Sequence, residues 1–143
     1  MLAYKGFRFQ KSIFVELQLK TGYSAGQFLT FLDVPQLRGM YVQGIEAFTD
    51  AQVTKTPTQN AVIEDAAKKE MLLSFFEMND AKFENIPYYT LIASNNGGLI
   101  RPFKDLKINI NKSGVFVGGT TATALKSLAF CFYYSTTPLH VSK

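Results

Sequence analysis

This sequence has one cysteine, one histidine and no tryptophan, which removes many of the side chains from which active sites are built. A single cysteine excludes an internal disulfide and a thiolate metal cluster. Cys131 stands inside an apolar, strand-like run, where a thiol stays protonated and inert. His140 falls in an expected C-terminal tail, 136–143, whereas a histidine base or metal ligand is held by neighbours on a rigid element. We therefore expect no catalytic residues, no metal site, no cofactor and no enzymatic activity.

The sequence also lacks long apolar stretches and a strong charge of either sign. No run approaches the length that spans a bilayer, and residues 1–11 have charges threaded through them where a signal peptide has an apolar core. The formal net charge is +4, and the basic residues are scattered along the chain. We expect a protein that is made in the cytoplasm and not secreted, without the one-sided basic patch typical of nucleic-acid binding.

Acidic and basic residues come closest together just before position 71. Glu64 and Lys68, and likewise Asp65 and Lys69, have the i,i+4 spacing of ion pairs on a helix, in the favourable order. A solvated helix face explains them better than a pair of catalytic carboxylates. We favour a short helix over residues 61–70, the alternative being a continuation of the preceding loop.

Aromatic residues are what the chain has in quantity, with thirteen Phe and seven Tyr among 143 residues. These residues favour strands and interfaces, where they fill large volumes on pleated surfaces. The length fits one domain, 1–143, whose core needs no disulfide or metal. Alternating or apolar segments predict about eight short strands, at 12–20, 27–34, 40–48, 72–78, 82–84, 105–111, 115–117 and 127–135.

Turn residues separate these strands, and no helix is expected between most of them. Asn79-Asp80 predicts the turn of a hairpin, and Gly44 marks a bulge where the apolar alternation shifts parity. Short strands with this punctuation favour an all-β sandwich or barrel over a parallel α/β sheet.

The last predicted strand, Ser127–Ser135, is apolar on both sides. Alternate side chains of an extended strand point in opposite directions, so its large residues on one side can fill the space between two sheets. On the other side stand Ala129, Cys131 and Tyr133, where a sheet that faces water would carry polar residues. This second side lies either beneath a loop or against another molecule, and only the latter supports a role in assembly.

Two neighbouring tyrosines are candidates for an exposed contact surface. Tyr88 and Tyr89 follow Pro87 and suit either a subunit contact or sugar stacking, the latter together with Asn95 and Asn96. For both tyrosines, packing in the core is the default interpretation.

Basic residues beside aromatic ones raise a nucleic-acid alternative. Phe7-Arg8-Phe9 and Arg101-Pro102-Phe103-Lys104 could stack single-stranded bases. These clusters lie far apart in the sequence, so a single-stranded nucleic-acid-binding barrel is the weakest of the binding alternatives.

Three segments together resemble a known family. They are Leu72-Leu-Ser-Phe-Phe-Glu-Met-Asn-Asp-Ala-Lys-Phe-Glu-Asn-Ile-Pro87, Leu99-Ile-Arg-Pro-Phe-Lys-Asp-Leu-Lys-Ile-Asn-Ile110 and Leu128-Ala-Phe-Cys-Phe-Tyr-Tyr134. They look like a hairpin, a Pro-bearing loop with its strand, and the closing strand of a small viral β-sandwich. The pattern resembles the single jelly-roll virion proteins, penton-type or minor capsid proteins, of tailless icosahedral bacteriophages.

The resemblance implies a single antiparallel jelly-roll sandwich whose role is assembly. Such a subunit packs against copies of itself, a pentamer at a vertex being an arrangement that fits, and against the major capsid protein. The segment 1–11 is either an edge strand or an arm that reaches a neighbour, an inner membrane surface or the packaged genome. The candidate interface residues are Tyr88, Tyr89, Cys131, Tyr133, Phe7 and Phe9.

The same resemblance implies a location in the virion after synthesis in the host cytoplasm, and no small-molecule substrate. Lectins share the jelly-roll strand pattern, because one fold serves many functions. The main alternative is therefore a carbohydrate- or receptor-binding β-sandwich for host attachment.

Overall fold

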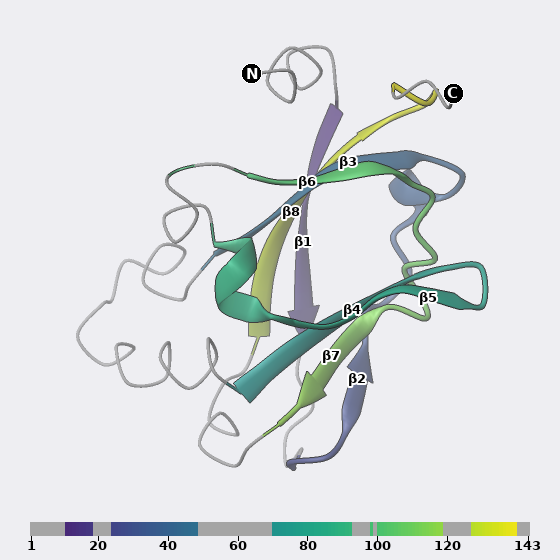
Figure 1. Ribbon diagram of the computed structural model, residues 1–143. Helices are drawn as coiled ribbons and strands as arrows, with labels where there is room; N and C mark the ends of the chain where they lie inside the picture. Colours follow the sequence, from purple (N-terminus) through teal and green to yellow (C-terminus); the bar gives the residue numbers. More distant parts are fainter. Residues whose placement is uncertain are drawn as a thin grey trace.

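The protein forms two four-stranded antiparallel sheets (Figure 1). The computed structural model describes residues 11–18, 24–48, 70–92, 98, 100–118 and 127–139. The strands are β1 (Lys11–Gln18), β2 (Phe28–Thr30), β3 (Tyr41–Phe48), β4 (Met71–Glu77), β5 (Asp80–Pro87), β6 (Arg101–Leu106), β7 (Gly114–Val117) and β8 (Ser127–Ser135). Two short 3₁₀ helices, η1 (Pro35–Leu37) and η2 (Tyr88–Leu91), complete the described elements.

The strand order shows how the chain is wound. The first sheet has the order β1-β8-β3-β6 and the second the order β2-β7-β4-β5. Each strand pairs with its counterpart counted from the other end of the chain: β1 with β8, β2 with β7, β3 with β6 and β4 with β5. A long hairpin that is rolled up in this way is a jelly roll. The expected all-β jelly-roll sandwich of eight strands is therefore confirmed.

The core lies between the sheets and is built largely from aromatic rings. Phe130 and Phe132 of β8 point inward from the first sheet, and Phe75 of β4 points inward from the second. The rings of Phe75 and Phe132 meet edge to face with centroids 6.5 Å apart, and Phe31 meets Phe130 in the same way at 5.3 Å. Such contacts stabilise a core beyond the area they bury, which explains much of the chain's aromatic content.

Most of the predicted strands are confirmed to within a few residues. β8 spans the predicted Ser127–Ser135, and β4 and β5 form the predicted hairpin. The pairing of β3 with both neighbours shifts register between Val42 and Gly44, which confirms the bulge. Lys11 belongs to β1, an edge strand of its sheet, whereas residues 1–10 and 61–69, with most of the expected helix, lie outside the described residues.

The second strand is shorter than the sequence predicts. The predicted strand 27–34 is reduced to β2, because β7 is its one neighbour in the sheet and begins opposite Thr30, at Gly114. The Phe31 N–H still donates to the Ser113 carbonyl at 3.0 Å, but Pro35 then begins η1.

The predicted strand 105–111 is wrong. β6 ends at Leu106, one residue after Asp105 takes a left-handed conformation with φ of 49°. The chain then turns, and the Ser113 N–H donates to the Ile110 carbonyl at 3.2 Å. Ile108 and Ile110 are nonetheless buried as predicted, because the turn packs its apolar side chains under the sandwich end.

The connection after β5 also begins later than predicted. Asn85 and Pro87 still belong to β5, and η2 follows directly. At the other end of the chain, the start of the expected tail is anchored: the Leu139 N–H donates to Asp105 Oδ1 at 3.0 Å. Buried Gln43 donates through Nε2 to the same oxygen at 2.6 Å, so one carboxylate joins β3, β6 and the tail.

Candidate functional surfaces

The outer face of the first sheet carries the smaller side of β8. The register places Cys131 between Phe14 of β1 and Glu46 of β3. In the adjacent row, Ala129 lies between Glu16 and Phe48. Small residues therefore run along the middle strand, with an aromatic and an acidic residue on each flanking strand.

Two rings from the flanking strands close over the small middle strand. Phe14 and Phe48 stand diagonally across β8, and their centroids are 6.1 Å apart. Because these rings lean toward each other above Ala129, that residue is only 6% exposed although it points away from the core. The second side of β8 is thus covered in part by its own sheet, without another molecule.

The polar groups on this face pair with one another. The Tyr133 hydroxyl donates to Glu46 Oε1 at 3.0 Å. Burial raises the pKa of the Cys131 thiol above its ordinary value, and the hydrogen bond with Tyr133 opposes this shift. Burial also raises the pKa of Tyr133, and its hydrogen bonds to Cys131 and Glu46 add to the effect. Both groups are therefore protonated at neutral pH, and Cys131 is a poor nucleophile.

The outer face of the second sheet has a different arrangement. The register aligns four apolar residues from four strands in one row across the sheet. We call this the apolar row; its members are Phe28, Phe116, Leu72 and Pro87. Their chain neighbours Leu73, Ile86, Val115 and Val117 are buried, which shows that the row points away from the core.

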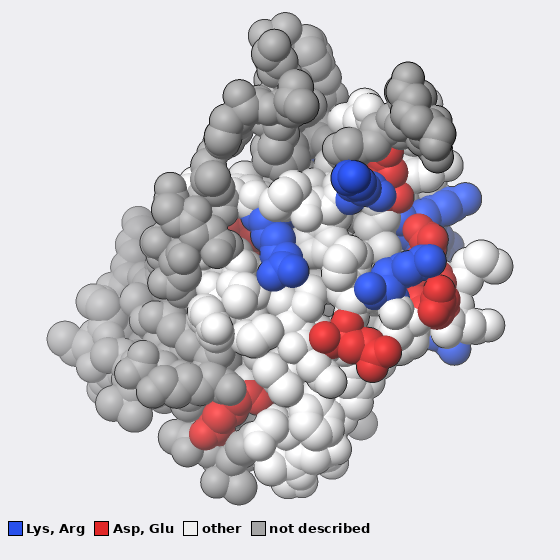
Figure 2. Space-filling model, viewed as in Figure 1, with Lys and Arg blue, Asp and Glu red and all other residues white. Residues whose placement is uncertain are grey.

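The part of this surface over β2 and β7 is uncharged, whereas β5 carries the exposed Lys82 and Glu84. The next row consists of Thr30, Gly114 and Ser74, so the described outward residues of β2, β7 and β4 include no charged side chain. Figure 2 shows white surface over β2 and the adjoining end of β7, with acidic side chains at its borders, while blue and red side chains gather around the β4–β5 hairpin. Phe28 is 43% exposed, and the other three members are half-buried.

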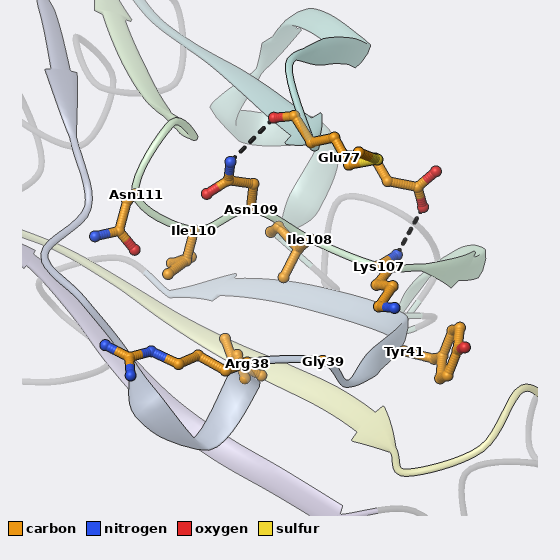
Figure 3. A pocket seen from close by; sticks show the side chains of 11 residues that line it. Arg38, Gly39, Tyr41, Glu77, Lys107, Ile108, Asn109, Ile110 and Asn111 are labelled. Atoms are coloured by element: carbon orange, nitrogen blue, oxygen red, sulfur yellow. Dashed lines mark hydrogen bonds between the residues drawn. The ribbon is translucent and has the colours of Figure 1, made fainter.

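A pocket of about 610 Å³ opens at the end of the sandwich where β4 turns into β5. One wall consists of Arg38, Gly39 and Tyr41, and the opposite wall is the turn 107–111 (Figure 3). Glu77 and Met78 complete the rim.

Hydrogen bonds fix the turn 107–111 against the end of β4. The Lys107 N–H donates to Glu77 Oε2 at 2.9 Å, and the Asn109 N–H donates to the Phe76 carbonyl at 2.7 Å. Asn109 Nδ2 also donates to the Met78 carbonyl at 3.0 Å. Three bonds over a short turn hold this wall in place, so the pocket is formed before any ligand binds.

The predicted tyrosine pair is divided between core and surface. Tyr88 is 2% exposed, because η2 turns it inward, where its hydroxyl donates to the Phe48 carbonyl and its ring packs on Phe130. The prediction that Tyr88 is exposed is therefore wrong. Tyr89 is 46% exposed, as predicted.

The other candidate contact residues differ in where the structure places them. Cys131 and Tyr133 are half-buried on the first sheet, and their role in an interface stays a prediction. Phe103 is buried and contacts Phe83 edge to face, so it does not stack bases. Four further predicted residues lie outside the described residues, namely Phe7, Phe9, Asn95 and Asn96.

Neither the apolar row nor the pocket was predicted from the sequence. No single segment contains either one, since the row draws one residue from each of four strands. The sequence indicated the apolar row only through one apolar residue at an outward position of each of the four strands. Ile108 and Ile110 were predicted to be buried, but nothing nearby in the sequence indicated the opposite wall of the pocket.

In the described part of the chain, no helix is long and apolar enough to cross a membrane. Within the same described ranges, no three His, Cys, Asp or Glu residues gather as ligands for a metal ion.

The fold and these surfaces define the protein as a jelly-roll sandwich with an apolar row on the outer face of its second sheet. No protein-family model, curated protein sequence or solved structure matches the chain.

Proposed function

We propose that this protein is a structural virion subunit, a penton-type or minor capsid protein that acts by self-assembly and by contact with the major capsid protein. The observation that carries the proposal is the apolar row. The jelly-roll fold and the resemblance to virion proteins of tailless bacteriophages support the same role. This role needs no catalysis and no cofactor, and it implies a location in the virion after synthesis in the host cytoplasm.

The apolar row suits a protein contact because of its shape and its charge. Its members lie side by side on a sheet, beside a row of small residues, so a partner meets a broad surface without large projections. Burying one exposed Phe side chain contributes about 1.5–3 kcal/mol. Copies of a chain with net charge +4 repel each other, and the apolar row, whose members carry no charge, is where a copy approaches with little repulsion.

A closed ring puts a further condition on this contact. Rotation about a ring axis joins two different patches of each subunit, so the apolar row meets another surface of the neighbouring copy or of the major capsid protein. The same face against itself would give a twofold dimer instead. The segment 1–10 precedes an edge strand and remains the proposed contact with an inner membrane surface or the genome.

Equal substitutions on the two outer faces test the proposal. Phe28→Lys places a charge on the apolar row, and Phe14→Lys places the same charge on the first sheet, at a residue that is even more exposed, 55%. We expect native mass spectrometry to show oligomers for the unsubstituted chain. Phe28→Lys should weaken association at least about tenfold, and Phe14→Lys should change it little.

A clean monomer at high concentration that also fails to bind capsid proteins would refute the proposal. Weakening by Phe14→Lys alone would move the contact to the first sheet and refute the role of the apolar row. The location of the chain provides an independent check, since purified virions should contain it at a fixed stoichiometry.

A further inference from the structure

The pocket at the hairpin end of the sandwich has the size and construction of a ligand site. Its volume of about 610 Å³ falls within the range of small-molecule sites, about 300–1,000 Å³. The turn 107–111 is fixed by three hydrogen bonds to β4 and to the hairpin, so little order is lost when a ligand binds. The pocket shares no residue with the apolar row.

The pocket combines an apolar floor with a polar rim. Leu37, Ile108 and Ile110 are buried side chains that line it from below. The rim presents a guanidinium, an ammonium, a carboxylate, two amides and a phenol. These belong to Arg38, Lys107, Glu77, Asn109, Asn111 and Tyr41.

The charges on this rim largely balance. Arg38 is paired with Asp33, and the Glu77 carboxylate stands on the side opposite Arg38 (Figure 3). Lys107 Nζ lies 5.8 Å from the centroid of the Tyr41 ring. An anionic ligand would meet the Glu77 carboxylate, and a cationic ligand would meet Lys107 and Arg38. Neither has complementary charge on all sides.

A neutral ligand with many hydroxyl groups can use the whole rim at once. Each hydroxyl both donates and accepts, so it can accept from an ammonium or amide and donate to a carboxylate or amide oxygen. The C–H face of a sugar ring can pack on the apolar floor formed by Ile108 and Ile110. We infer that this pocket binds a neutral carbohydrate, with Glu77, Lys107 and Asn111 as its principal polar contacts.

The site is independent of the assembly role proposed above. A subunit whose association fails the mass-spectrometric test can still bind sugar, and an assembled subunit that ignores sugar remains a capsid protein. The pocket also lies away from Tyr88 and Tyr89, which follow β5 at the opposite end of that strand from the hairpin.

A nuclear magnetic resonance titration tests the inference directly. The ¹⁵N-labelled chain is titrated with neutral oligosaccharides of glucose, galactose, mannose and N-acetylglucosamine, and in parallel with sialylated ones. We expect at least one neutral sugar to shift the amide signals of Lys107, Asn109 and Asn111 in a saturable way. Binding should persist in high salt, because no net charge is being neutralised.

Three variants identify the contacts. Glu77→Gln keeps an oxygen acceptor for the Lys107 N–H, so the turn is retained while the carboxylate is lost. Lys107→Ala removes the ammonium, and Lys104→Ala removes an equally exposed lysine of β6 that does not line the pocket. The first two should weaken binding about tenfold each, and Lys104→Ala should leave it unchanged.

Three outcomes would overturn the inference. The first is the absence of any saturable shift with the neutral panel. The second is binding confined to sialylated sugars that disappears in high salt, since that pattern indicates attraction to lysines in general. Equal weakening by Lys104→Ala and Lys107→Ala would likewise place binding outside the pocket.

Discussion

The two outer faces of this sandwich use aromatic residues in opposite ways. On the first sheet, Phe14 and Phe48 lean together over Ala129 and cover it. On the second sheet, Phe28 and Phe116 stand beside each other in a row that nothing in the same sheet closes over. An apolar strand in the sequence therefore does not by itself identify the face that needs a partner.

The difference follows from where the small residues stand. The middle strand of the first face offers Ala129 and Cys131, which leave space for rings from the flanking strands. On the second face the middle strands carry Leu72 and Phe116, which already fill the space above the sheet. Rings at the sides cannot lean inward there, so the surface stays broad and apolar.

The largest expected effect concerns the two sides of β8. We expect its inner side to stabilise the fold and its outer side to contribute little. Phe132→Ala empties a fully buried site between the sheets and should cost about 3–5 kcal/mol in the free energy of unfolding. Cys131→Ala on the outer side should cost less than about 1.5 kcal/mol. Urea unfolding followed by circular dichroism measures both. Similar losses for the two variants would contradict the distinction between the sides.

The next effect concerns the close approach of β2 to β7 on the second sheet. A Cβ at Gly114 would overlap the Leu29 carbonyl oxygen and lie 2.8 Å from the Thr30 Cα. Gly114→Ala should therefore destabilise the protein by about 1–3 kcal/mol and displace β2. Because Phe28 belongs to β2, the variant should also weaken self-association. Unchanged stability would show that the row tolerates a shift of β2.

A smaller effect tests whether the two rings on the first sheet act as a pair. Phe14→Ala and Phe48→Ala, singly and together, form a double-mutant cycle on the free energy of unfolding. Rings at 6.1 Å should show a coupling of about 0.5–1.5 kcal/mol. The same cycle on Phe28 and Leu72, which stand two strands apart, serves as the control. Equal coupling energies in the two pairs would contradict the proposed difference between the two outer faces.

The smallest effect is a dependence of stability on pH at the first sheet. The folded state raises the pKa of the Cys131 thiol above its ordinary 9.0, so above that pH the folded chain holds a proton that the unfolded chain releases. The thiol therefore makes its full contribution to stability below about pH 9, and this contribution is lost as the pH rises through the pKa of the thiol in the folded state. Ser12, Tyr133 and Glu46 face this thiol, and Tyr133, whose pKa is also raised, contributes to the same decline.

Cys131→Ala separates the thiol's contribution from that of Tyr133. The variant should lose stability less steeply between about pH 8 and pH 10, as measured by urea unfolding at each pH. Identical slopes for the variant and the unsubstituted chain would show that the thiol is not shielded on this face.

Most strands were predictable from the sequence, whereas several of their ends were not. Alternation located β1 and β3, a short apolar run located β8, and the Asn79-Asp80 turn located the hairpin. β2 ends early because β7, its antiparallel neighbour, begins only at Gly114, opposite Thr30. The sequence of one segment does not indicate how long its partner strand is. Segment 105–111 alternates like a strand, but it is a turn that buries Ile108 and Ile110.

The candidate surfaces were less predictable than the fold. Tyr89 is exposed as expected, but Tyr88 is buried, because η2 rotates successive side chains away from the strict alternation of a strand. The walls of the pocket come from the segment before β3 and from the turn after β6, which the sequence separates widely.

By itself, the sequence determined that the chain forms an aromatic-rich, all-β domain and which side of most strands is apolar. Those properties are local, since alternation with a period of two needs only a few consecutive residues. The tertiary structure alone decided that Phe14 and Phe48 close one face while the apolar row leaves the other open. That decision depends on the register between strands that meet only when the long hairpin rolls up, and no short segment encodes such a register.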